Sequence, residues 1–163
     1  MELVARNPFA KLRSRGRANR RRPMTDEEFQ TLLGGSDAAF RRFLIFLKFT
    51  GCRPGEAASM RWADVRFEEG AVVLQEHKTA RKTGRPRIIP LVPTVIKLLR
   101  WMREQAKGKG FGQDRVFVNR RGNALSRGWL SLKMQRLRKR LGLAAGVTLY
   151  GLRHRYGLMG IRA

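Results

Sequence analysis

Apolar residues recur along this chain with two different periods, and the change between the periods predicts the order of its elements. After residue 22, apolar positions three or four apart predict a helix that begins at Thr25 and a strongly apolar helix that begins at Ser36 or Asp37. Thr25 and Glu28 have the spacing of a capping box. The second helix has apolar residues on most of its faces, up to Phe49, and is therefore expected at the centre of the core.

A strand-like period follows from Val65 onward. Residues 65–67, 72–74 and 87–91 predict three short strands, with a turn near Gly70 and a basic hairpin loop before the third. Helices are expected around residues 95–102, after Ser126 and from Tyr150, with a further short strand at 116–118 and a short helix that starts at Pro54. The pattern predicts an α+β fold that is mainly α-helical, with a small three-stranded antiparallel sheet.

Charge sets this chain apart from ordinary globular proteins. It has 36 Lys and Arg against 12 Asp and Glu, a formal net charge of +24, with eight basic residues in 1–22 and twelve in an acid-free stretch at 115–163. A chain that is 42% hydrophobic can still bury a core, which excludes a disordered basic tail. We therefore expect a basic linker or arm at residues 1–22, a folded domain at 23–163, and a polyanionic partner, with nucleic acid as the first candidate.

Several classes of protein are excluded or disfavoured by composition. The single cysteine, Cys52, excludes a disulfide framework, and the spacing of cysteine and histidine residues suggests no metal site. No apolar run approaches the roughly 18–20 residues of a membrane span. We expect no membrane contact, no cofactor and no metal, and a cytoplasmic location.

Three basic residues lie in positions where the backbone is expected to be rigid. Arg53 follows a helix break between Gly51 and Pro54, Lys78 lies on the basic hairpin, and Arg153 enters the last helix. Three such cations can converge on one phosphate and stabilise the charge of a pentavalent transition state. Arg53 taken alone is better explained as an arginine of a surface turn, and only the recurrence of three such cations favours a phosphate site.

The segments that contain these cations resemble those of a known family. They read TGCRPGEA at 50–57, HKT at 77–79 with RIIPL at 87–91, and LYGLRHRY at 149–156. In this order they resemble the first arginine box, the lysine-bearing β-hairpin and the His-x-x-Arg box of the tyrosine recombinases, or phage integrases. Residues 7–10 and the capping box at Thr25 resemble the interdomain linker and the first catalytic-domain helix of that family.

The resemblance implies a role for each matching residue. Arg53 and Arg153 would bind the non-bridging oxygens of the scissile phosphate, and Lys78 would protonate the leaving 5′ oxygen. Glu56 would orient the site. Tyr150 stands where the family has a histidine; a phenol can donate a hydrogen bond but is a poor general base at neutral pH. For His154 a structural hydrogen bond is expected rather than catalysis.

The family's later His/Trp position and its nucleophilic tyrosine would both come after the last residue here, because the chain stops ten residues beyond Arg153. Tyr156 is expected to pack into the core rather than to act as the nucleophile. We therefore expect an incomplete catalytic domain that binds DNA without exchanging strands by itself, and a last helix that exposes Leu158, Met159 and Ile161.

Duplex DNA is the partner that this resemblance implies, in a nucleoid-associated protein of a bacterium or phage. The intact enzyme would act by phosphotyrosyl strand transfer, and the resemblance leaves its assembly on DNA open. Two alternatives remain, a non-enzymatic basic nucleic-acid-binding module and a type IB topoisomerase-like fragment. The expected DNA-contacting residues are all basic: Arg20, Arg21, Arg22, Arg81, Lys82, Arg85, Arg87, Arg136 and Arg140.

Overall fold

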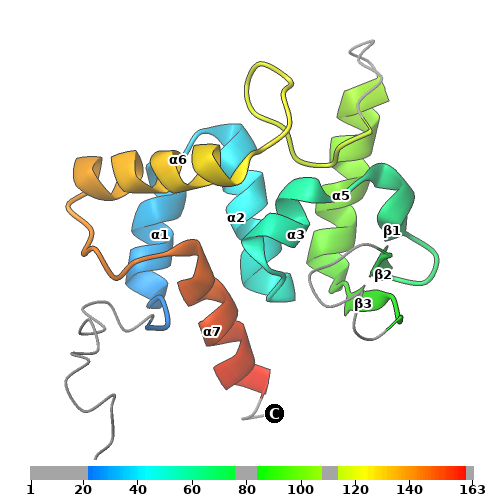
Figure 1. Ribbon diagram of the computed structural model, residues 1–163, viewed down its shortest axis with the longest axis horizontal. Coiled ribbons are helices and arrows are strands. Elements are labelled where there is room, and N and C mark those ends of the chain that lie inside the picture. Colours follow the sequence, from blue (N-terminus) through cyan, green and yellow to red (C-terminus); the bar gives the residue numbers. More distant parts are fainter. Residues whose placement is uncertain (1–21, 76–83, 108–113, 161–163) are drawn as a thin grey trace, which may run out of the picture.

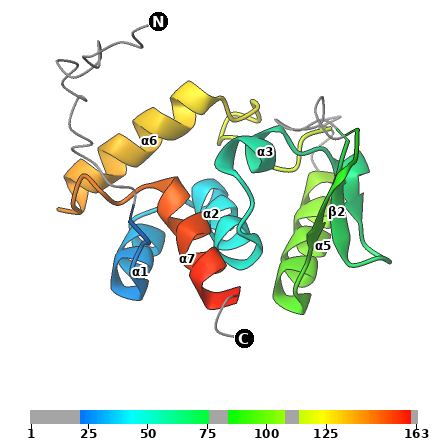
Figure 2. The same ribbon diagram turned by 60° about the horizontal axis from the view of Figure 1, so that its bottom comes forward.

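Helices form most of the protein in the computed structural model, which describes residues 22–75, 84–107 and 114–160. Figures 1 and 2 show α1, α2, α6 and α7 on one side, the sheet and α5 on the other, and α3 between them. The elements are α1 Asp26–Gly34, α2 Ala38–Thr50, α3 Pro54–Ser59, the 3-10 helix η1 Trp62–Asp64, β1 Val65–Arg66, β2 Ala71–Leu74, β3 Arg87–Pro90, α5 Pro93–Lys107, α6 Arg127–Arg140 and α7 Leu149–Gly160. The expected α+β class is confirmed.

The helices begin where local capping chemistry predicts. At α1 the Glu28 N–H donates to Thr25 Oγ1 at 3.2 Å, and the Thr25 N–H donates to Glu28 Oε2 at 3.0 Å. Asp37, rather than Ser36, caps α2 with its side chain. Ser126 caps α6. These side chains accept hydrogen bonds from N–H groups that have no partner inside the helix.

The sheet is antiparallel, in the order β1-β2-β3, as predicted. Arg87, the first residue of β3, pairs with Leu74 at the hairpin end of the β2–β3 ladder. The strand expected at 116–118 is wrong, since within this segment only Val118 forms an isolated bridge, to Ala124. Val116 and Phe117 are 3% and 2% exposed, so the apolar residues that suggested a strand pack into the core from a segment that has no neighbouring strand, among the described residues, to form a ladder with.

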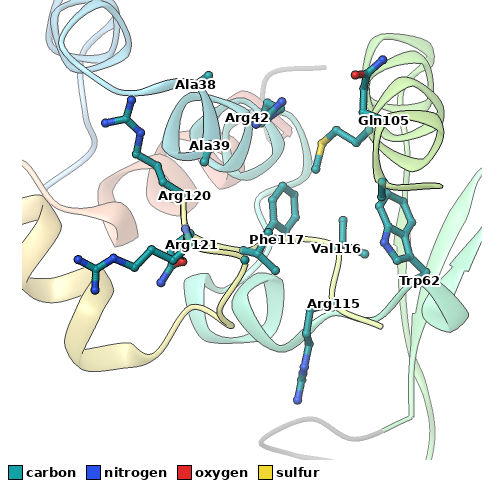
Figure 3. Close-up of a pocket in the computed structure, with 15 residues that line it drawn as sticks. Ala38, Ala39, Arg42, Trp62, Gln105, Arg115, Val116, Phe117, Arg120 and Arg121 are labelled. Atoms are coloured by element: carbon teal, nitrogen blue, oxygen red, sulfur yellow. Dashed lines mark hydrogen bonds between the residues drawn. The ribbon is translucent and has the colours of Figure 1, made fainter. Parts of the chain in front are cut away.

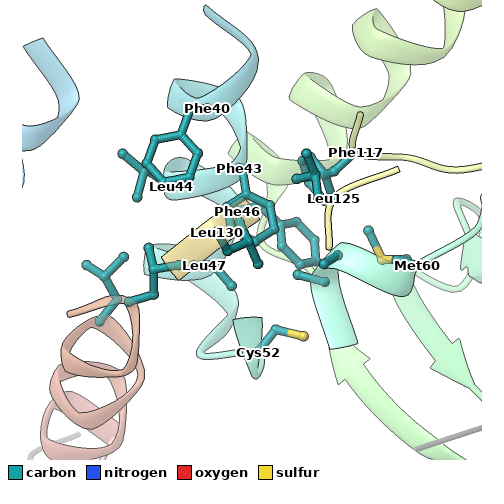
Figure 4. Packing of buried hydrophobic residues seen from close by; sticks show 14 of the residues in the cluster. Phe40, Phe43, Leu44, Phe46, Leu47, Cys52, Met60, Phe117, Leu125 and Leu130 are labelled. Carbon is teal, nitrogen blue, oxygen red and sulfur yellow. The ribbon is translucent and has the colours of Figure 1, made fainter. Parts of the chain in front are cut away.

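The core is built around α2, as its apolar pattern predicts. Phe40, Phe43 and Phe46 are almost fully buried, and Phe117 packs edge-on against Phe43 with ring centroids 5.3 Å apart (Figure 4). Phe49 is the exception, because it lies on the outward face of α2 and remains 38% exposed. Across the described residues, no helix is both long enough and apolar enough to span a bilayer.

Candidate functional site

A left-handed turn at the end of α2 organises the site. Gly51 has φ +58° and ψ +17°, and its N–H donates to Leu47 O at 3.0 Å. A side chain is strongly disfavoured here because a Cβ atom on Gly51 would lie 2.4 Å from Cδ1 of Tyr156. Three residues later Pro54 begins α3, with the fixed φ that suits a first helical position. Arg53 is thus held between the end of one helix and the start of the next.

Glu56 holds Arg53 by two contacts. Arg53 Nη1 donates to Glu56 Oε1 at 2.6 Å, and the Arg53 backbone N–H donates to Glu56 Oε2 at 3.2 Å. The Glu56 side chain is only 7% exposed, and Arg87 Nε lies 3.4 Å from its Oε2. The pKa of Arg53 is raised, first by the hydrogen bond to Glu56 and then by the Glu56 charge, with smaller effects from Tyr150 and Cys52. The Arg53 guanidinium therefore keeps its charge and has a fixed position.

Arg153, which lies on the last helix α7, also contacts this turn. Its Nη1 donates to Gly51 O at 2.7 Å across a separation of 102 residues. The contact is possible because α7 packs beside α2 (Figure 2) and because Gly151 lets α7 approach the segment before α1, where a Cβ would lie 3.0 Å from Arg22 O. The structure thus brings Arg153 to the turn that holds Arg53.

Cys52, between Gly51 and Arg53, is 1% exposed. Burial raises the pKa of its thiol to about 12, the charge of Glu56 adds to the rise, and Arg87 and Arg153 oppose it. The thiol donates to Glu56 Oε2 across 3.7 Å. Cys52 is therefore a neutral packing residue and not a nucleophile.

This assignment predicts that the native protein resists thiol reagents. With a thiol pKa of about 12 instead of its ordinary value, the thiolate fraction at pH 8 falls by about 10³. The labelling rate of Cys52 by a disulfide reagent is expected to rise by about that factor in denaturing urea. Rapid stoichiometric labelling of the folded protein would contradict the assignment.

Tyr156 and His154, which follow Arg153 on α7, have other surroundings than the sequence predicts. Tyr156 does not enter the core: it is 40% exposed, and its ring lies against Gly51. The reason is its place on the face of α7 that meets the α2 turn, three residues after Arg153. His154 is exposed on α7 and makes no hydrogen bond within the described parts of the chain. Tyr150, 38% exposed, contributes to the electrostatics of Arg53.

The expected DNA-contacting residues have different surroundings. Arg22 forms an ion pair with Glu28, and Arg140 donates to Gly35 O beside the α1–α2 junction. Arg85 and Arg136 are exposed. Arg87 lies in the cluster with Glu56. The remaining candidates lie outside the described residues: Arg20, Arg21, Lys78, Arg81 and Lys82.

Arg87 and Arg155 are the cations whose positions sequence reasoning missed. Arg87 was expected among the hairpin cations, and its contact with α3 has no local sequence signal. Arg155 forms an ion pair with Asp26 and donates to Met24 O at 3.0 Å, which ties α7 to the start of α1. A pair of arginines two apart on one helix gives no indication that one faces the site and the other faces α1.

A cavity that the sequence did not predict lies away from this cluster. It has a volume of about 500 Å³ and is lined in part by Ala39, Met102 and Phe117, at the opposite end of α2 from Gly51. Arg115, Arg120 and Arg121 line it as well, but their guanidinium groups point in different directions, away from its centre (Figure 3). Among the described residues, no group of three or more His, Cys, Asp or Glu could hold a metal ion.

Known proteins resemble the chain in sequence and in fold. The model of the Phage integrase family matches residues 13–159. The tyrosine recombinase XerC of Xanthomonas campestris pv. campestris is 28% identical over 94% of this chain and 47% of its own length. The tyrosine recombinase XerD of Listeria monocytogenes is 28% identical over 82% of this chain and 43% of its own length.

Solved structures agree on the fold. The Tn1549 transposon integrase in complex with transposon right end DNA has a TM-score of 0.73 at 18% identity, over 98% of this chain and 60% of that one. The XerA recombinase has a TM-score of 0.67 at 22% identity, over 86% of this chain and 51% of that one. The chain spans about half the length of the curated relatives it matches. A family match over most of its residues establishes that the chain belongs to the phage integrase family.

Proposed function

We propose that this chain is the DNA-binding, phosphate-holding portion of a site-specific tyrosine recombinase. The observation that supports this most is the contact of Arg153 with Gly51 O, which brings two arginines 100 residues apart in sequence to one turn. The matched relatives are named tyrosine recombinases, and the Tn1549 integrase was solved with DNA. The acid-free sequence from residue 115 onward favours the same partner, double-stranded DNA, for a nucleoid-associated protein of bacterial or phage origin.

The proposed mechanism follows from the fixed positions of the arginines. Arg53 and Arg153 donate hydrogen bonds to the non-bridging oxygens of one phosphodiester, and these bonds strengthen as charge develops in the pentavalent transition state. Glu56 keeps the Arg53 guanidinium in place before DNA binds, so that little reorganisation is needed. Tyr150 supplies a hydrogen-bond donor, and Lys78 protonates the leaving 5′ oxygen. The intact recombinase would complete the reaction through a 3′-phosphotyrosyl link.

The alternatives differ from this proposal in what they predict. In a non-enzymatic basic module, Arg53 would contribute no more to binding than any exposed arginine. A type IB topoisomerase-like fragment would bind without depending on one DNA site. A recombinase is expected to prefer its own site over random DNA by roughly 10³-fold or more.

The first test compares Arg53→Ala and Arg153→Ala with the exposed control Arg66→Ala, using a duplex oligonucleotide at several salt concentrations. Each site variant is expected to reduce the slope of log K against log salt by about 0.9, because one phosphate contact is lost. Equal slopes for all three variants and the wild-type chain would refute the phosphate-holding role.

Strand cleavage is tested with a nicked suicide DNA substrate. The 163-residue chain is expected to form no covalent protein–DNA adduct, since we assign neither of its two tyrosines as the nucleophile. An adduct that disappears in Tyr156→Phe would overturn that assignment.

A further inference from the structure

Arg87 is fixed to the site from a third direction. It is the first residue of β3 and is held there by the ladder to Leu74, immediately after the basic hairpin. Its side chain reaches α3, where Nε lies 3.4 Å from Glu56 Oε2. Arg53 comes from the α2–α3 turn and Arg153 from α7, so three separate elements each place one arginine around the same turn.

Arg53 and Arg87 share one carboxylate and are equally accessible. Arg53 contacts Glu56 Oε1 and Arg87 lies beside Oε2, while the two arginine side chains are 28% and 26% exposed. An arginine that served only to neutralise a buried carboxylate could be covered completely. Here each arginine keeps about a quarter of its side chain open to a ligand.

The charges of this cluster do not balance. Arg53, Arg87 and Arg153 contribute +3 and Glu56 contributes −1, which leaves +2 among these described residues. Arg87 Nε is also buried without a hydrogen-bond acceptor among the described residues, because its contact with Glu56 lacks hydrogen-bond geometry. Surplus charge and an unsatisfied buried donor at one place both favour an anionic oxygen ligand.

We propose that Arg87 is a third phosphate-contacting arginine of this site, and that its shared contact with Glu56 couples the strand after the hairpin to the turn of Arg53. This inference rests on the proposed function. It assigns to Arg87 a phosphate oxygen in the same site as Arg53 and Arg153, rather than a distant stretch of DNA backbone along the hairpin.

The test measures the salt dependence of duplex binding by the whole 163-residue chain carrying Arg87→Gln, Arg87→Lys or the exposed control Arg66→Gln from the same sheet. Arg87→Gln is expected to reduce the slope by about 0.9, so that the loss of affinity between 50 and 200 mM salt shrinks about 3.5-fold. Arg87→Lys retains the charge and is expected to retain the slope. Arg66→Gln is expected to leave it unchanged.

A second measurement distinguishes a direct contact of Arg87 with phosphate from an effect of its substitution on folding. Inorganic phosphate is titrated into each folded variant, and the Arg Nε–Hε signals are followed by NMR. The Arg87 signal, identified by its loss in Arg87→Gln, is expected to shift together with those of Arg53 and Arg153. An Arg87 signal that stays in place, or an Arg66→Gln slope that falls as far as the Arg87→Gln slope, would overturn this inference.

The outcome for Arg87 can be distinguished from the outcome for the site as a whole. If the slope of log K against log salt were unchanged in both Arg53→Ala and Arg153→Ala, the proposed function itself would be refuted. Slopes that fall in those two variants but not in Arg87→Gln would refute only the role of Arg87.

Discussion

Replacing Glu56 with alanine is expected to lower the free energy of unfolding by about 3 kcal/mol. Loss of one member of a buried ion pair typically costs 3–5 kcal/mol, because the remaining charge has no partner. The low end applies here because Arg53 and Arg87 keep 28% and 26% of their side chains exposed. Urea unfolding with an unchanged m-value provides the measurement.

A second acidic residue provides the matched control. Asp114 forms an ion pair with Arg61 in which the two side chains are 50% and 54% exposed, so Asp114→Ala is expected to cost about 0–1 kcal/mol. Glu56→Gln keeps the shape and a hydrogen-bond acceptor and should fall between the two alanine variants. If Glu56→Ala were no more destabilising than Asp114→Ala, Glu56 would not organise the arginines as described.

Signals that act over a few residues were readable from the sequence. The capping residues Thr25 and Ser126 act on N–H groups two or three positions away, and Pro54 determines its own φ. The turn between α2 and α3 could therefore be placed without a structure, and so could Arg53. Arg153 was named from its place at the start of the last helix, and the family resemblance then gave it a role, because its box follows at the expected place in the chain.

Contacts between distant elements were not readable in the same way. Whether Arg87 serves the hairpin or α3 depends on how the sheet docks beside α3, and no residue near Arg87 encodes that docking. Tyr156 was expected inside because the family usually has a core-packing aromatic three residues after the arginine that Arg153 matches. However, α7 meets α2 at the Gly51 turn, and that leaves the Tyr156 ring half-exposed. Residues 116–118 have a strand-like composition, but Phe117 packs in the core against the ring of Phe43.

Replacing Gly51 with alanine is expected to cost about 2–5 kcal/mol and to disturb phosphate binding as well. The left-handed conformation at φ +58° costs a residue with a Cβ about 1–2 kcal/mol. The new Cβ would also lie 2.4 Å from Tyr156 Cδ1, and relieving such overpacking typically costs a further 1–3 kcal/mol. Because Arg153 binds the Gly51 carbonyl, a shift of this turn would also separate Arg153 from Arg53.

Two further variants distinguish the cost of the left-handed backbone at Gly51 from the cost of the clash between the new Cβ and Tyr156. Gly55→Ala is the matched control: nothing lies within 4 Å of its Cβ position and it is a helical residue of α3, so alanine should stabilise by up to about 1 kcal/mol. Combining Gly51→Ala with Tyr156→Ala removes the collision and leaves the strain, so the double-mutant cycle should show favourable coupling of about 1–3 kcal/mol. Zero coupling would mean that the Tyr156 ring does not press on Gly51. In that case α7 could approach the turn without glycine, and Gly51 would serve the backbone conformation alone.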